Sequence, residues 1–302
     1  MKVTYYKYFI ENGGNRYQFK ILPTLKNFCK IKDQKFRRSF LTPAEDNLFL
    51  FHIDSCTFLF VLTKNNELIK TISGDSMSHE DIYEKLNADE SLGFASYIFV
   101  GHNYYGIAST FFGPKNSYWL HFINLLFEKL DLEHYSLGSE SFPVETTKQA
   151  ALKFSFKGQT LIRVNSSSPY FSQLSGLFGG GKNEASSFTI EIKPEVRQDM
   201  PKTFDSVINT IPLEGVEKFI VRGKEHFEDS MTDYYIVGSG HISDSISIKD
   251  ESKICQAIED KVSKNRQLKE AVTKYAKDET YIKADLPDIS CFSDLASWPW
   301  NI

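Results

Sequence analysis

The chain has 302 residues, of which 41% are hydrophobic and 25% are charged, and its mean hydropathy is −0.32. This length and composition exclude a disordered chain and a small disulfide-stapled domain, and they predict one large domain or two ordinary ones. The formal net charge is −4, which argues against a protein that is basic throughout, so any nucleic-acid binding would need a local basic patch.

Neither the cysteines nor the N-terminus point to export or to a metal. The cysteines lie far apart and have no C-x-x-C or Cys/His ligand spacing, at Cys29, Cys56, Cys255 and Cys291. We expect reduced thiols and no metal. Lys7 interrupts the apolar residues at the N-terminus, and no small-residue cleavage site follows, so this stretch is not a signal peptide. We therefore expect a cytoplasmic protein without a membrane-spanning segment.

The first charged segment follows a predicted hairpin of strands 3–10 and 16–21, which turns at Asn12-Gly-Gly-Asn15. The segment 26–38 is the most basic in the chain. Its cations are Lys26, Lys30, Lys32, Lys35, Arg37 and Arg38. Phe28 and Phe36 lie between them, where a base or sugar could stack. The segment is therefore either a phosphate-binding surface or a solvated helix and loop with two anchoring aromatic residues.

The core of the N-terminal domain is expected around an uncharged stretch between Glu90 and Lys115. Gly101-His-Asn103 divides it, which favours a turn over a helix. We expect a buried hairpin over 95–112 and a covering helix over 118–130. The apolar face of that helix comprises Trp119, Phe122, Ile123, Leu126 and Leu130. The preceding segment predicts strands 47–53, 57–63 and 68–72 and a helix over 79–86, within a domain of residues 1–131.

The second domain is expected over residues 132–302, because the chain becomes polar and loop-like from 131 to 147. The predicted elements are a hairpin of 151–156 and 160–164, helix 168–178, strand 188–193, helix 201–211, and strands 218–221, 234–237 and 241–248. A long helix follows over 251–277, with a polar gap at Asn265. The fold class is α+β, with two domains whose antiparallel or mixed sheets are covered by helices.

Several pieces of the sequence, in order, resemble one family. DESLGF at 89–94, the aromatic-rich strand after it and FGP at 112–114 resemble the RexA family of phage-exclusion proteins. The resemblance extends backwards through 53–54, 57–60 and 79–86, and it recurs more sparsely downstream at 192–194, 222–224 and 240–243. The resemblance implies a two-domain, RdgC-like α+β dimer that binds double-stranded DNA without sequence preference. It also implies a role in sensing phage infection and aborting it with a membrane partner, a RexB-like channel.

A second set of cations completes the predicted DNA-binding residues. It comprises Lys193, Arg197, Lys202, Arg222 and Lys224. They follow the ends of two predicted strands and the start of a helix, so they would share one edge of the second domain if those strands are neighbours. A helix N-terminus there would add backbone donors for phosphate. Glu195 and Asp199 reduce the positive charge of this segment.

Other chemistry is weakly indicated, and we expect no catalytic site and no cofactor. Residues 176–183 approach a phosphate-binding loop but end in Asn183 instead of Ser or Thr, and the predicted helix and strand flank it in reverse order. Glu191 and Lys193 match half of a metal-dependent nuclease site, without the second acid. The alternatives are therefore the DNA-binding subunit of another membrane-partnered system, such as Kiwa, a nuclease effector, or a non-catalytic scaffold that docks through Trp298, Trp300 and helix 251–277.

Overall fold

The chain folds into two compact units. The computed structural model describes residues 1–37, 39–64, 70–73, 78–81, 92–177, 185–195, 198–229, 231–247 and 250–299. The first unit comprises Met1–Ser141, Ser243–Lys264 and Leu268–Ile302, and the second comprises Phe142–Ile242 and Asn265–Gln267. The chain thus returns to the first unit after the second, which differs from the boundary expected near residue 131. The reason is strand pairing between distant segments.

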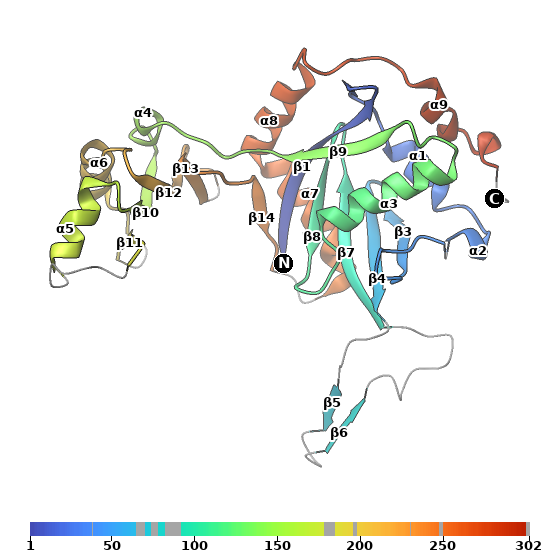
Figure 1. Cartoon of the computed structure of the whole chain (residues 1–302), viewed down its shortest axis with the longest axis horizontal. Coiled ribbons are helices and arrows are strands. Elements are labelled where there is room, and N and C mark those ends of the chain that lie inside the picture. Colours follow the sequence, from blue (N-terminus) through green and yellow to red (C-terminus); the bar gives the residue numbers. More distant parts are fainter. Residues whose placement is uncertain are drawn as a thin grey trace. The chain divides into compact units, whose positions relative to one another are not determined.

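The first unit is built on an antiparallel sheet with the strand order β14-β1-β8-β7-β4-β3. Its strands are β1 (Lys2–Asn12), β2 (Asn15–Tyr17), β3 (Leu48–Asp54), β4 (Thr57–Lys64), β7 (Leu92–Val100), β8 (Tyr104–Ser109), β9 (Ser136–Ser141) and β14 (Ser243–Ser245). Figure 1 shows β1 beside strands from both the middle and the C-terminal part of the chain.

Strand β1 pairs along both of its edges. Its first half pairs with β8 and, over three residues, with β14, while its second half pairs with β9 and with β2. The turn to β2 places Gly13 and Gly14 at φ values of 56° and 80°, as the Gly-Gly pair predicts, because both central residues of this tight turn need positive φ. The N-terminal ammonium also donates to the Ile246 carbonyl oxygen (2.7 Å).

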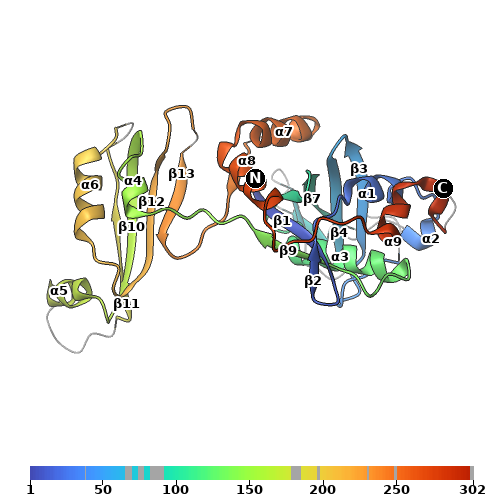
Figure 2. The same cartoon turned by 90° about the horizontal axis from the view of Figure 1, so that it is seen from above.

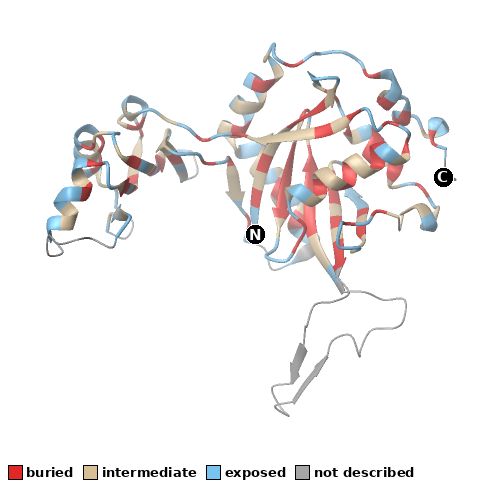
Figure 3. Ribbon diagram, in the orientation of Figure 1, coloured by how far each residue is buried: buried red, intermediate tan, exposed pale blue. Residues whose placement is uncertain are grey.

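Helices cover both faces of this sheet (Figures 1 and 2). On one face lies α3 (Asn116–Lys129), whose predicted apolar stripe is confirmed: Trp119, Phe122, Ile123 and Leu126 are at most 1% exposed. On the other face lie α7 (Ile254–Lys264) and α8 (Arg266–Ala276), which bury Ile258 and Leu268. Figure 3 shows buried residues along the strands between these two layers.

The C-terminal segment packs on the α3 side of the first unit. It contains α9 (Pro287–Ser290) and the short 3₁₀ turns Cys291–Ser293 and Leu295–Ser297. Trp298 is 6% exposed, lies against Phe28 and Phe292, and donates its Nε1 hydrogen to the Phe292 carbonyl oxygen (2.8 Å). Trp298, which the scaffold alternative would use for docking, is therefore buried in the core of the first unit, and Trp300 lies outside the described residues.

The second unit is a four-stranded antiparallel sheet in the order β11-β10-β12-β13. Its elements are α4 (Lys148–Ala151), β10 (Phe156–Asn165), α5 (Pro169–Leu177), β11 (Ser187–Ile192), α6 (Pro201–Thr210), β12 (Val216–Lys224) and β13 (Thr232–Val237). One face is buried under α6, through Phe204 and Ile208, and under α5, whose Phe171 lies 4.9 Å from the ring of Phe188. The α+β class with antiparallel sheets is thus confirmed for the described chain.

Three predicted elements of the second half are wrong. Residues 136–141 form β9 instead of a loop, because pairing with β1 outweighs their polar sequence. The expected hairpin over 151–164 is α4 followed by the single strand β10. Gly158 does not turn the chain there: a Cβ would lie 2.7 Å from the Arg222 carbonyl oxygen, so glycine allows β10 and β12 to approach. The helix over 251–277 is interrupted at Asn265.

Two further predictions fail in the first half. Residues 78–81 form β6, paired with β5 (Lys70–Ser73), where the helix over 79–86 was expected to begin; the rest of that helix lies outside the described residues. Strand β8 ends at Ser109 instead of Phe112, and Phe111 is 88% exposed. In the described part of the chain, no helix combines the length and the apolar character needed to cross a membrane.

Candidate nucleic-acid interface

The basic segment 26–38 is held on the first unit by two short helices. Helix α1 (Leu22–Phe28) begins with a proline in its first turn, where the missing N–H costs nothing, and it buries Leu25 and Phe28. Helix α2 (Gln34–Arg37) follows after Ile31, which is 1% exposed. The apolar residues face the core, so the lysines between them are directed to solvent.

Three of these lysines are exposed and lie close together in the sequence, and we call them the lysine cluster: Lys30, Lys32 and Lys35. Lys26 lies beside it on α1 and is half-buried. Lys30 donates to Asn27 Oδ1 (3.3 Å), and within the described chain none of the four makes an ion pair. Their charges are therefore not neutralised by neighbouring described carboxylates, which is the condition for attracting phosphate.

Arg37 does not belong with this group, although the sequence placed it there. Its Nη2 donates to the Leu50 carbonyl oxygen (2.5 Å) and its guanidinium lies 5.3 Å from the ring of Phe51. Because β3 is the last strand of the sheet order, this bond occupies the open edge of the strand, which would otherwise invite pairing with another chain. Arg37 thus has a structural role, and Arg38 lies outside the described residues.

The two aromatic residues of the segment are also unsuited to stacking on bases. Phe28 is 1% exposed and packs against Phe40 and Phe122, and Phe36 is half-buried with its ring 5.5 Å from Phe40. Nearby, burial raises the pKa of the Cys29 thiol to about 12, so Cys29 stays protonated and unreactive at neutral pH. The segment therefore offers charge to a ligand, and little stacking surface.

Replacing Arg37 with alanine tests its structural role. We expect a loss of about 1.5–3 kcal/mol in the free energy of unfolding, because the Leu50 carbonyl loses a charged donor. The measurement is urea denaturation followed by circular dichroism. Lys35→Ala is the control, because it removes a solvated side chain from the same helix. It should change the free energy of unfolding by less than about 0.5 kcal/mol. If both variants were equally stable, the structural role of Arg37 would be contradicted.

The predicted cations of the second unit do not lie on neighbouring strands. Thr160 of β10 pairs with Ile192 of β11 on one side and with Val221 of β12 on the other. Lys193 and Arg222 therefore lie at the same end of the sheet but are separated by β10, which places their strands about 9–10 Å apart. The condition set for a shared edge, that the two strands are neighbours, is therefore not met, although Lys193 and Arg222 lie at the same end of the sheet.

The face of this sheet opposite α5 and α6 is balanced in charge. Lys193 pairs with Glu191 (2.9 Å), Arg222 with Asp233 (3.6 Å) and Arg163 with Glu217 (3.1 Å). Lys218 lies over the ring of Tyr235 (5.8 Å). Exposed pairs of this kind contribute little to stability, but opposite charges side by side cancel the potential that a phosphate would feel.

The remaining predicted cations of the second unit are dispersed. Lys224 is half-buried and donates to the Phe227 carbonyl oxygen (3.0 Å). Lys202 is exposed in the first turn of α6, without an ion pair among the described residues. Arg197 lies outside the described residues. Of the four that the structure describes, only Lys202 lies at the helix N-terminus that the sequence predicted.

Within the described residues, neither alternative chemical site gains the additional residues that its chemistry requires. Glu191 pairs with Lys193 and accepts a hydrogen bond from Gln159, and the neighbouring strand β10 has no acidic side chain. Of the glycine-rich loop 176–183, residues 178–183 lie outside the described residues; α5 precedes it and β11 follows it. A phosphate-binding loop has the reverse order, strand before and helix after.

Sequence reasoning omitted a further set of cations from the candidate interface. They are the exposed lysines of the C-terminal helices and the residue after them: Lys264, Lys269, Lys274 and Lys277. The structure describes no ion pair for them. Their signal in the sequence is the polar face opposite the apolar stripe of 251–277, which the pattern attributes to solvation.

These features define the class of the protein: as far as the chain is described, it consists of two α+β units with antiparallel sheets, and the first unit carries lysines without ion pairs. The family described as "RexA: Intracellular sensor of Lambda phage, Abi component" matches residues 1–231. Protein rexA of Escherichia phage lambda is 30% identical over 218 residues, which cover 67% of this chain and 73% of the relative. Protein rexA of Enterobacteria phage 434 matches with the same values. The chain belongs to the RexA family, and this membership supports a role in antiphage defence, by phage exclusion.

Proposed function

We propose that the protein senses phage infection by binding double-stranded DNA without sequence preference, as a homodimer in the cytoplasm. The family description, an intracellular phage sensor, supports the sensing role. The observation that supports DNA as the ligand is the lysine cluster, whose three exposed ammonium groups have no ion pair among the described residues. Contacts of this kind bind phosphate and carry no sequence information.

The lysine cluster is the principal contact in this proposal, and Lys26 and Lys202 are secondary ones. Lysine binds phosphate as a point charge on a flexible chain, so it tolerates any register of the duplex backbone. Lys193 and Arg222 contribute less, because each must first exchange its carboxylate partner for a phosphate. The net charge of −4 keeps the affinity modest and strongly dependent on salt.

The second part of the proposal is a membrane-protein partner, a RexB-like channel that carries out the response once the sensor is engaged. It follows from the family resemblance alone. A partner of a different kind, as in Kiwa-like systems, is the alternative within the same class. Co-purification from cells that express the neighbouring membrane protein would distinguish them by the identity of that protein.

Fluorescence anisotropy with a random-sequence duplex tests the DNA-binding part. We expect binding at 50 mM salt that falls steeply by 200 mM, with equal affinity for a second, unrelated duplex, because each phosphate contact releases counterions. Magnesium should neither be required nor lead to cleavage. Absence of binding at 50 mM salt would contradict the proposal and favour a protein-interaction role, while cleavage abolished by Glu191→Ala would favour the nuclease alternative.

A further inference from the structure

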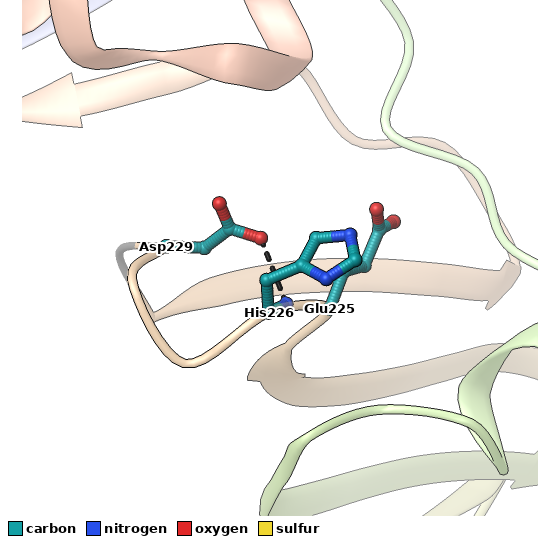
Figure 4. Close-up of side chains that lie close together, drawn as sticks. All are labelled: Glu225, His226 and Asp229. Carbon is teal, nitrogen blue, oxygen red and sulfur yellow. Dashed lines mark hydrogen bonds between the residues drawn. The ribbon is translucent and has the colours of Figure 1, made fainter.

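The turn between β12 and β13 in the second unit brings three potential metal ligands together. Glu225 directly follows β12, and His226 and Asp229 lie in the turn that leads to β13. One ligand atom from each, a carboxylate oxygen or an imidazole nitrogen, lies within 4.8 Å of the other two. Figure 4 shows the His226 ring between the two carboxylates.

The backbone fixes the positions of Asp229 and His226 relative to each other. The Asp229 N–H donates to the His226 carbonyl oxygen (3.0 Å), and the His226 N–H donates in return to Asp229 Oδ2 (2.9 Å). Lys224 Nζ donates to the Phe227 carbonyl oxygen (3.0 Å) and so holds the base of the turn. The ligand atoms are therefore presented by a closed turn, which lowers the cost of bringing them together.

Glu225 is positioned by groups outside the turn. Its Oε2 lies 3.4 Å from Nη2 of Arg266, and the hydroxyl of Tyr234, a residue 2% exposed, donates to the carboxylate. Burial and the carboxylates of Glu225 and Asp229 raise the pKa of Tyr234, so the hydroxyl remains a donor. A carboxylate offers about four lone-pair positions, so Glu225 can keep both partners and still bind an ion. Such supporting contacts are what orient ligands in metal sites.

The charges of the turn favour a cation. Asp229 has no ion pair among the described residues, and its carboxylate accepts the His226 N–H, while Glu225 shares one arginine. Two carboxylates this close repel each other, and a divalent ion between them would relieve the repulsion. An imidazole with two carboxylates is a ligand set for Zn²⁺ and related ions, whereas Ca²⁺ and Mg²⁺ prefer oxygen alone.

We propose that Glu225, His226 and Asp229 form a binding site for a divalent transition-metal ion of the zinc type, with water as the fourth ligand. In a tetrahedral site the ligand atoms lie about 3.3 Å apart, given metal–ligand bonds of about 2.0–2.1 Å. The ligand atoms, which lie within 4.8 Å of one another, must therefore approach to this distance by small side-chain rotations, which the exposure of His226 permits. The bound ion would tie the end of β12 to the turn. The sequence did not indicate this site, because its spacing, E-H-x-x-D, matches no zinc pattern.

Isothermal titration of the full chain with Zn²⁺, after removal of any affinity tag, tests the site. We expect one ion per chain with a dissociation constant in the micromolar range or below. His226→Gln and Asp229→Asn should each weaken binding at least tenfold, because each removes one of three protein ligands. Glu228→Gln is the matched control, since Glu228 is exposed in the same turn and lies outside the cluster; it should bind as the wild type does.

Cobalt provides a second readout that distinguishes this site from one made by the four cysteines. Co²⁺ bound by nitrogen and oxygen gives visible d–d bands without thiolate charge transfer. Unfolding in urea without metal should be the same for all variants, so that a loss of binding reports the ligands and not the fold. Zinc binding that survives in both His226→Gln and Asp229→Asn, charge-transfer bands with Co²⁺, or no binding at all would each overturn the proposal.

Discussion

Replacing Lys30, Lys32 and Lys35 together with glutamine should weaken the binding of duplex DNA about 10²–10³-fold at 0.1 M salt. Each phosphate contact contributes about 0.9 to the slope of log affinity against log salt concentration. Three contacts therefore raise the affinity by about 2.7 logarithmic units when salt is lowered from 1 M to 0.1 M. The same variant should lower the salt slope by about 2.7. Anisotropy titrations at several salt concentrations measure both quantities. Glutamine keeps the aliphatic stem, so the fold of α1 and α2 is preserved.

The control removes the same number of charges elsewhere. Lys193→Gln, Lys218→Gln and Arg222→Gln together also change the net charge from −4 to −7. Because Lys193 and Arg222 are already paired with carboxylates and Lys218 lies over Tyr235, this variant should lose less than tenfold in affinity. Equal losses in the two variants would mean that only net charge matters, and the lysine cluster would no longer be the interface.

Trp298→Ala should reduce the free energy of unfolding by about 3–5 kcal/mol, the range found when a buried large aromatic side chain is truncated. The Trp298 ring packs against Phe28 and Phe292. The substitution also removes the Nε1 donor from the Phe292 carbonyl oxygen. Because Phe28 belongs to α1, the variant should also loosen the segment that presents the lysine cluster. Chemical denaturation measures the first effect, and hydrogen exchange of residues 22–37 measures the second.

Phe111→Ala is the matched control for this truncation. Phe111 is also aromatic but 88% exposed, so its removal should change the free energy of unfolding by less than about 0.5 kcal/mol. If Trp298→Ala were as stable as Phe111→Ala, the C-terminal segment would not be part of the core of the first unit, and the alternative of a scaffold that docks through this segment would gain support.

Local pattern predicted the elements whose burial is set by their own residues. The stripe from Trp119 to Leu126 predicted α3 and its buried face, and Gly13-Gly14 predicted the first turn. The pattern failed where a distant partner decides the structure. The polar residues of β9 form a strand because β1 is beside them, and β14 belongs to the first unit for the same reason. Such pairing leaves no periodic signal within the segment itself.

The candidate interface was predicted in the same uneven way. Runs of charge identify lysines that remain in solvent, and Lys30, Lys32 and Lys35 are exposed as expected. The sequence cannot show which cations find partners across the fold. Arg37 reaches the Leu50 carbonyl, and Arg222 reaches Asp233 on the next strand. The Glu225–His226–Asp229 turn was missed because its ligands become a group only when the chain closes on itself.

The pairing of β1 with β14 has a consequence for the synthesis of the protein. The strand β1 leaves the ribosome more than two hundred residues before its partner Ser243–Ser245. At about 5–20 residues per second, roughly 10–50 s pass before β1 can complete its sheet. During that interval the second unit, which lies between them in the chain, can fold first. A nascent or prematurely terminated chain therefore lacks a finished first unit, and the sheet of that unit is complete only after translation has passed β14.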